Sequence, residues 1–192
     1  MTQFESDVDI LKKITTHRSN NYDQIRILGG TSFNEEHYSG VFLFTYDKVT
    51  KKIYFLGVPY RSTYYKDHES NEHTKLQGEA PKDTGRRETF EECGYLLEKK
   101  NMDELRSRPV PNRNDKTKLH YRYFYFTDKF SGTLSDFGFG PNPIDGETST
   151  ALWISAKIFK EVLYRGHQAS FDELVSLLRN VNIEYYDALK GI

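Results

Sequence analysis

Apolar and polar positions along the chain predict several strands. Residues 39–46 form a continuous apolar, β-prone run, which is typical of a buried strand. A polar turn at 47–52 separates it from a second such run at 53–58, so the two predict a β-hairpin. Residues 119–127 alternate and predict another strand, and a short strand is centred on Trp153.

Helical spacing appears in three parts of the chain. Residues 4–16 place apolar side chains at loose helical spacing and predict a short N-terminal helix or arm. Residues 81–93 begin with a proline and are followed by Gly94, which favours a helix that stops there. A pair of C-terminal helices is predicted over about 156–164 and 170–180.

The order of these elements predicts the fold class. Hairpin, helix, strands and then helices fit an α/β sandwich with a central mixed sheet between helices. An extended segment from 22 to 28 is predicted to end at Gly29-Gly30, and 61–75 and 131–146 are predicted loops. No repeat or linker divides the chain, so we expect a single domain over 1–192 with a short N-terminal extension of about residues 1–37.

Composition and charge narrow the function classes. A formal net charge of -1 gives no sign of a protein that coats nucleic acid or a membrane surface. Cys93 is the only cysteine, so no intrachain disulfide forms, and we expect it to be a small buried residue. The sequence has no signal-peptide-like or bilayer-spanning apolar run, so we expect a cytoplasmic protein that does not engage a membrane. Monomer and homodimer both stay open.

Three glutamates share one face of the predicted helix. Glu88, Glu91 and Glu92 stand at i, i+3 and i+4, so their carboxylates would repel one another. Clustered hard oxygen ligands are what Mg²⁺ or Mn²⁺ prefers. The pattern alone also fits a solvated acidic face balanced by Arg86 and Arg87.

The surrounding residues resemble the Nudix box. Residues 78–95 read GEAPKDTGRRETFEECGY. From Arg87 onward, this segment matches every charged and glycine position of the second half of the box, and the match needs no gap. Glu79 falls at the required distance before Arg87. The opening glycine of the box is replaced by His73, and Thr89 stands in an apolar slot.

The resemblance covers roughly residues 38–165 and implies a Nudix-like α/β/α sandwich. It implies Mg²⁺- or Mn²⁺-dependent hydrolysis, by water attack on phosphorus, of a pyrophosphate bond in a nucleoside diphosphate linked to another moiety. By resemblance, Glu91 and Glu92 are metal ligands, and Glu88 is a ligand or the base that activates water. Arg87 would pair with Glu79, Gly94 would close the helix, and the backbone carbonyl of His73 is a further candidate ligand.

Two residues outside the box are further candidates. The family often places an acid before the Trp-containing strand, and Glu147 is our candidate for an additional ligand or base. Asp145, Asp136 and an ordinary solvated acid stay open as alternatives. Arg61 follows the second strand of the hairpin, where related enzymes often place a phosphate-contacting cation, and a plain surface arginine is the alternative.

Other residues have simpler interpretations. The spacing of the histidines matches no standard metal site, so loop histidines are expected at His68, His73 and His120. Base stacking by tyrosines is conceivable, but sheet packing is the default for Tyr121, Tyr123 and Tyr125, while Tyr64 and Tyr65 lie in a predicted loop. One packing stripe of the box helix is expected to contain Arg86, Phe90, Cys93 and Leu97.

Substrate choice is expected to come from the loops 61–75, 108–118 and 131–146. A dinucleoside polyphosphate, a nucleotide sugar, a nucleoside triphosphate and a capped RNA end all stay open as substrates. The main alternative function is a catalytically weak or inactive Nudix-like module that binds a nucleotide as a sensor, which the altered position 73 favours. A partner-binding domain with an acidic surface helix is a second alternative.

Overall fold

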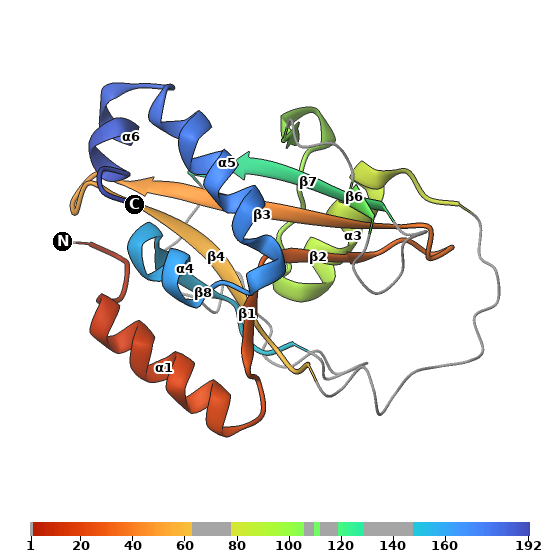
Figure 1. Ribbon diagram of the computed structural model, residues 1–192, viewed down its shortest axis with the longest axis horizontal. Coiled ribbons are helices and arrows are strands. Elements are labelled where there is room, and N and C mark those ends of the chain that lie inside the picture. The colour runs from red at the N-terminus through yellow and green to blue at the C-terminus, as the bar shows by residue number, and fades with distance from the viewer. Residues whose placement is uncertain (1, 63–77, 106–109, 112–118, 129–147) are drawn as a thin grey trace.

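The computed structural model describes residues 2–62, 78–105, 110–111, 119–128 and 148–192. Figure 1 shows a long central sheet with helices around it. The strands are β1 (Gln24–Arg26), β2 (Leu28–Thr31), β3 (His37–Asp47), β4 (Lys52–Tyr60), β5 (Asp103–Glu104), β6 (Val110–Pro111), β7 (Leu119–Phe126) and β8 (Leu152–Ser155). The α-helices are α1 (Asp7–Ser19), α3 (Pro81–Cys93), α4 (Ala156–Val162), α5 (Gln168–Arg179) and α6 (Ile183–Ala188), with short 3₁₀ turns at Lys99–Asn101 and Arg165–His167.

The sheet is mixed. Its strand order is β1-β4-β3-β7-β5, while β2 pairs with β3, β6 with β7 and β8 with β4. The pairing of β3 with β7 is parallel. The predicted hairpin is confirmed, since β3 and β4 pair antiparallel up to a turn that joins Asp47 to Lys52.

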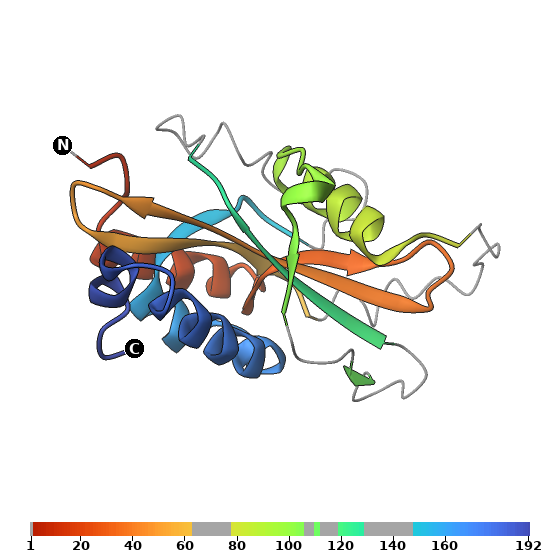
Figure 2. The same cartoon turned by 90° about the horizontal axis from the view of Figure 1, so that it is seen from above.

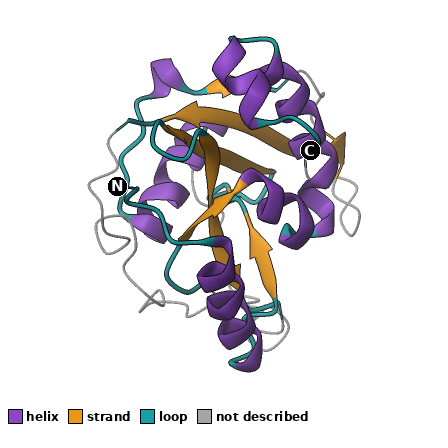
Figure 3. Cartoon of the chain, turned by 90° about the vertical axis from the view of Figure 1, so that its left-hand side faces the viewer, coloured by secondary structure: helices purple, strands orange, loops and turns teal. Residues whose placement is uncertain are grey.

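Helices cover both faces of this sheet. Seen from above in Figure 2, α3 lies on one face and α1, α4, α5 and α6 lie on the other. Figure 3 shows the same arrangement from the side, with the strands between the helices. The predicted α/β sandwich with a central mixed sheet is therefore confirmed.

The two faces of β3 bury side chains in two different cores. Phe42 and Phe44 join the core under α5, whereas Val41 and Leu43 join the core under α3. Successive side chains of a strand point to opposite faces, so a strand covered on both sides reads as a continuous apolar run. This explains the pattern at residues 39–46.

The box helix has the predicted bounds, 81–93. It ends at Gly94, whose φ of 76° places it in the left-handed region and whose N–H donates to the Phe90 carbonyl over 2.8 Å. Glycine favours this conformation because it has no Cβ to clash.

The expected packing stripe of this helix is wrong at Phe90, whose side chain is 48% exposed. The face turned to the sheet instead contains Gly85, Thr89 and Cys93. A Cβ added at Gly85 would lie 3.2 Å from Cγ2 of Val41, so the helix approaches β3 closely. This close approach fixes which face of α3 is buried.

Several boundaries differ from the predictions. The N-terminal helix begins at Asp7 because Ser6 caps it by accepting the Asp9 N–H. Gly29 and Gly30 do not end an extended segment but lie inside β2. The loop assignment of His120 is wrong, since this residue lies in β7. Strands β5 and β6 and helix α6 were not predicted.

The predicted substrate loops fall largely outside the described residues. Among the residues that the structure describes, no helix combines the length and apolar character needed to cross a membrane.

Truncating Phe171 tests the core beneath α5. This fully buried ring contacts the rings of Phe42, Phe55 and Phe159. We expect Phe171→Ala to lower the free energy of unfolding by about 3–5 kcal/mol, because it leaves a cavity. Chemical denaturation measures this. Phe126→Ala is the matched control, since that ring is 46% exposed, and an equal loss in both variants would contradict this packing.

Candidate active site

The carboxylates of α3 meet β2 at two consecutive glycines. The Gly29 N–H donates to Oε1 of Glu92 over 2.6 Å. A Cβ added at Gly30 would lie 2.3 Å from Cδ of Glu88, so only a glycine leaves room for that side chain. Gly30 thus leaves room for Glu88, and the Gly29 N–H holds Glu92 against the backbone of β2.

Arg87 holds the acidic face of the helix together. Its Nε and Nη2 donate to the two carboxylate oxygens of Glu79 over 3.0 and 3.1 Å. Its Nη1 donates to Glu88 over 2.9 Å and to Glu91 over 3.3 Å. Nη2 also donates to the Thr31 carbonyl over 3.0 Å, which ties the helix to the end of β2. The guanidinium therefore links the start of the box, its helix and β2.

The guanidinium is also packed from above. The Phe33 ring lies over it, with 4.0 Å from Cζ of Arg87 to the ring centroid. Phe33 itself is 43% exposed. A cation over an aromatic face is attracted to the ring, and the contact shields one side of the ion pairs from water.

A buried hydrogen-bond chain continues behind Glu79. The Thr84 hydroxyl donates to Oε1 of Glu79 over 2.7 Å and lies 2.9 Å from Nε2 of His37. Ser39 donates to the Pro81 carbonyl over 2.7 Å. Both His37 and Ser39 belong to β3, so the first turn of α3 is fastened to the sheet on this side.

Burial and pairing oppose each other at Glu79. Burial disfavours its charged form, but hydrogen bonds from Arg87 and Thr84 and the charge of Arg87 outweigh it and lower the pKa of Glu79. Burial acts against the charged form of Arg87 as well, yet Glu79, Glu88 and Glu91 together raise the pKa of Arg87. Both groups are therefore charged at neutral pH.

The carboxylates supply suitable donors for a divalent ion. Glu88 and Glu91 share one guanidinium nitrogen, and Glu88 and Glu92 lie against adjacent residues of β2. Carboxylate oxygens are the ligands that Mg²⁺ and Mn²⁺ prefer. In the part of the chain that the structure describes, however, no three His, Cys, Asp or Glu side chains form a ready metal-binding group. The donor set fits such an ion, provided that Glu88 and Glu91 exchange contacts with Arg87 for it.

The other predicted site residues are not brought to this place. His73 and Glu147, with its rivals Asp136 and Asp145, lie outside the described residues. Arg61 follows β4, where its Cζ lies 5.0 Å from the Tyr22 ring centroid. No contact among the described residues joins it to the glutamates, and its phosphate-binding role stays a prediction.

The remaining interpretations fit simple packing. Tyr123 and Tyr125 are buried and Tyr121 packs against the core under α3, so the packing prediction for these three is confirmed. Tyr64, Tyr65 and His68 lie outside the described residues. Cys93 is buried as predicted, and burial raises the pKa of its thiol to about 12. A protonated thiol is a poor nucleophile.

Sequence reasoning missed the part of β2 that receives the carboxylates. Gly29 and Gly30 were interpreted as a terminus, although a paired glycine in a strand also signals the close approach of another group. His37 and Thr84 carried no local signal, because their contact depends on how α3 docks on β3.

Comparisons with known proteins give low similarity. No protein-family model and no curated protein sequence matches this chain. A MutT/nudix family protein from Enterococcus faecalis matches at 18% identity and a TM-score of 0.38, over 61% of this chain and 42% of that one, so this chain spans less than half of its length. An Ap4A hydrolase from C. elegans matches at 15% identity and a TM-score of 0.43, over 73% and 96%. The MERS1–RNA complex from T. brucei matches at 12% identity and a TM-score of 0.37, over 66% and 53%. At these scores the likeness assigns no activity to this chain.

The Glu79–Arg87 pair makes stability depend on pH. Because the folded pKa of Glu79 is depressed, its contribution is present above the ordinary glutamate pKa of about 4.3 and is lost as pH falls through the folded value. We expect Glu79→Gln to lower the free energy of unfolding by about 2 kcal/mol at pH 7, and by less as the pH is lowered. Denaturation at several pH values measures the difference. Glu98→Gln is the control, because the Glu98 side chain is 55% exposed. If the difference in free energy of unfolding between wild type and Glu79→Gln did not change with pH, this account of the pair would be wrong.

Proposed function

We propose that this chain is a Nudix-type hydrolase that cleaves a pyrophosphate bond in a nucleoside diphosphate linked to another moiety. The observation that carries the proposal is the convergence of Glu88 and Glu92 on the Gly29–Gly30 backbone, with Glu91 and Glu88 both held by Arg87. An ordinary solvated acidic face has no need of this arrangement, since water would satisfy its carboxylates.

Metal binding is assigned to Glu88, Glu91 and Glu92. A divalent ion bound there supplies charge for the phosphate oxygens and lowers the pKa of a bound water. The backbone carbonyl of His73 stays a candidate ligand.

The chain's own residues then position and deprotonate the nucleophile. A water oxygen forms a new bond to one phosphorus of the pyrophosphate, and the bridging P–O bond breaks, leaving two products that each end in a phosphate group. The proton of the water passes to a carboxylate, for which Glu88 and Glu147 are the candidates. Arg87 and Glu79 keep the helix and β2 in position throughout, so catalysis relies on placement and charge and needs no covalent intermediate.

The resemblance to the Nudix box is the only basis for the substrate class, and it leaves several substrates open. A dinucleoside polyphosphate, a nucleotide sugar, a nucleoside triphosphate and a capped RNA end all contain the bond that this chemistry cleaves. Arg61 remains a proposed phosphate contact, and a cytoplasmic location remains an expectation.

A nucleotide-binding sensor is the second candidate function. The specific observation in its favour is that the described carboxylates contact Arg87 and the β2 backbone and do not form a ready group of three metal ligands. In such a module the guanidinium would serve as the permanent counter-charge, and the helix would be a structural element.

Neutralising the proposed ligands one at a time tests the reaction. We expect Glu91→Gln and Glu92→Gln each to lower phosphate-product formation from nucleotide diphosphate derivatives, with Mg²⁺ or Mn²⁺, by at least about a hundredfold. Glu104→Gln, at an exposed position in β5, is the control and should keep full activity. Equal turnover by wild type and both box variants would point to a contaminant, and ligand binding without any turnover would favour the sensor.

Filling the space at Gly30 distinguishes an effect on metal binding from an effect on folding stability. An alanine Cβ there collides with a flexible carboxylate side chain, so we expect Gly30→Ala to move Glu88 and weaken Mn²⁺ binding by about tenfold. The free energy of unfolding should change by less than about 1 kcal/mol. Calorimetric titration and denaturation measure the two quantities. Gly78→Ala is the matched control, because its Cβ would meet only Asn34 at an ordinary 3.4 Å; unchanged Mn²⁺ affinity in Gly30→Ala would contradict the assigned site.

A further inference from the structure

Two arginines and two histidines lie close to one another, and we call them the cationic cluster: Arg26, His120, Arg122 and His167. Arg122 and His120 lie on the α5 face of the sheet because Phe124, two residues beyond Arg122 on β7, packs against the core under α5. Arg26 belongs to β1, and His167 directly precedes α5. The Tyr164 ring lies 4.4 Å from Cζ of Arg26 and 5.2 Å from the His167 ring, so it joins these two members of the cluster. Burial, followed by the charges of Arg122, Arg26 and His120, lowers the pKa of His167 well below its ordinary value.

Arg122 is a buried cation without a carboxylate contact in the described part of the chain. Its side chain is 8% exposed. One Nη donates to the Tyr121 carbonyl over 3.3 Å, the other lies 3.1 Å from Nδ1 of His120, and Nε is buried with no hydrogen-bond partner. A desolvated guanidinium lacking a counter-charge is unfavourable, and its planar fork matches the oxygens of a phosphate.

Arg26 is held between two aromatic rings. Its Cζ lies 4.0 Å from the centroid of Tyr60 and 4.4 Å from that of Tyr164. Its Nε donates to the neutral Gln24 amide over 2.9 Å. Asp23 is the acid whose charge interacts with it. The rings fix the guanidinium without neutralising it.

A row of two glycines connects Arg122 to the candidate active site. In the sheet register, Gly29 of β2 pairs with Gly40 of β3, and Gly40 pairs with Arg122 of β7. Neighbouring strands lie about 4.8 Å apart, so the backbone of Arg122 is about 10 Å from that of Gly29. A Cβ at Gly40 would come within 3.3 Å of Cδ of Arg122, so the glycine leaves space for the arginine stem.

The edge of β2 that faces away from β3 connects the cationic cluster to the carboxylates of α3. The N–H of Ile27, the residue directly before β2, donates to Nδ1 of His167 over 3.4 Å, and the Gly29 N–H within β2 donates to Glu92. Two residues of extended chain span about 7 Å, so His167 and Glu92 bond to backbone positions about 7 Å apart. Because Nδ1 accepts, the proton of the neutral His167 ring is on Nε2, which can donate to an anion.

Tyr38 packs against two members of the cationic cluster, and its pKa is also influenced by the carboxylates of α3. Tyr38 lies 5.2 Å from the His120 ring centroid, and Arg122 lies 5.2 Å over the Tyr38 ring. Burial raises the pKa of Tyr38 to about 12; the two arginines of the cluster oppose this rise, while Glu92 and Glu88 add to it. The Tyr38 ring thus packs against His120 and Arg122 of the cationic cluster.

We propose that the cationic cluster binds a phosphate group of the nucleotide, beside the carboxylates assigned to the metal. Arg122 donates to the phosphate oxygens through its fork, Arg26 adds a second positive charge, and His167 adds a neutral donor. The phosphate supplies the counter-charge that Arg122 lacks among the described residues. The identity of the ligand rests on the proposed function, whereas the preference for an anion rests on the cluster alone.

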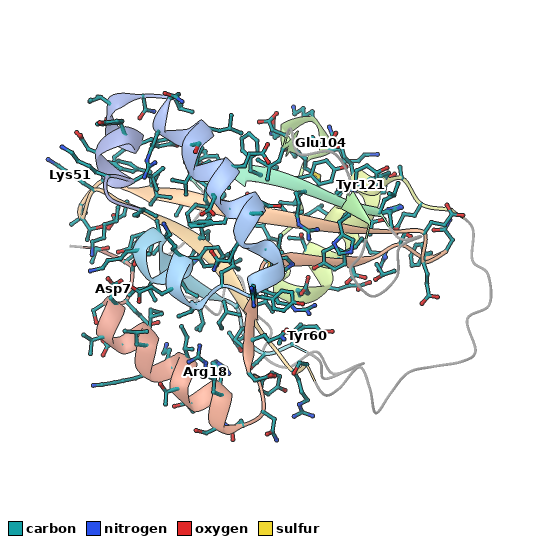
Figure 4. All side chains as sticks on the ribbon, in the orientation of Figure 1. Asp7, Arg18, Lys51, Tyr60, Glu104 and Tyr121 are labelled. Atoms are coloured by element: carbon teal, nitrogen blue, oxygen red, sulfur yellow. The ribbon has the colours of Figure 1, made fainter. Side chains whose placement is uncertain are left out.

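Nucleotide binding without metal tests this proposal separately from hydrolysis. We would titrate the whole chain with ADP and with pyrophosphate in the presence of EDTA, by calorimetry, and compare wild type with Arg122→Met and Arg26→Gln. Either variant should weaken binding by at least about tenfold, because each removes charge-assisted donors. Arg122→Met should unfold at the same or higher denaturant concentration, since a purely structural arginine would lose stability on replacement. Arg18→Gln is the control, because Arg18 is an exposed residue of α1 (Figure 4).

The possible outcomes test the proposed phosphate subsite independently of the proposed reaction. Equal binding by wild type and both variants, or no binding of ADP and pyrophosphate by wild type, would overturn the subsite. If Arg122→Met does not fold, Arg26→Gln decides the question. A chain that binds ADP through Arg122 and Arg26 but hydrolyses no nucleotide derivative would refute the proposed reaction and leave the phosphate subsite standing.

Discussion

The guanidinium of Arg87 is the contact on which the rest of the candidate site depends. It joins Glu79 at the entry of the box, Glu88 and Glu91 on the helix, and the Thr31 carbonyl at the end of β2. Three acids on neighbouring turns would otherwise repel one another, and the entry segment would have no charged partner. One cation thus sets the position of α3 relative to β2 and keeps the carboxylates close together.

The second constraint is the edge of β2 that no described strand pairs with. Backbone groups at Ile27, directly before this strand, and at Gly29 and Thr31 within it form hydrogen bonds with His167, Glu92 and Arg87 in turn. The first of these comes from the α5 side of the sheet and the other two come from α3. An edge of this kind exposes polar groups that must be satisfied, and here a neutral histidine, a carboxylate and a guanidinium satisfy them. The carboxylates of α3 and one member of the cationic cluster are therefore bonded to the same short stretch of backbone.

Local signals predicted much of the fold and little of how the site is assembled. The hairpin and the box helix follow from short-range patterns, namely a continuous apolar run and a proline–glycine pair that bounds a helix. The glutamates could be placed on one helix face for the same reason. Their partner Gly30 could not be found, because that contact depends on the docking of α3 across the sheet. Phe90 misled the choice of buried face, since its apolar character was outweighed by the close approach at Gly85. Arg122 was missed because its neighbourhood is created by the parallel pairing of β3 with β7, which joins residues far apart in the sequence.

The central claim is that the box carboxylates hold a divalent ion against the Gly29–Gly30 backbone. The most direct test is paramagnetic broadening in the amide NMR spectrum of the ¹⁵N-labelled chain during titration with substoichiometric Mn²⁺. The account predicts that the amide signals of Gly29, Gly30 and Glu88 to Glu92 broaden first, and that excess Mg²⁺ restores them. Broadening that begins elsewhere, or that spares the β2 glycines while other acidic segments respond, would contradict it.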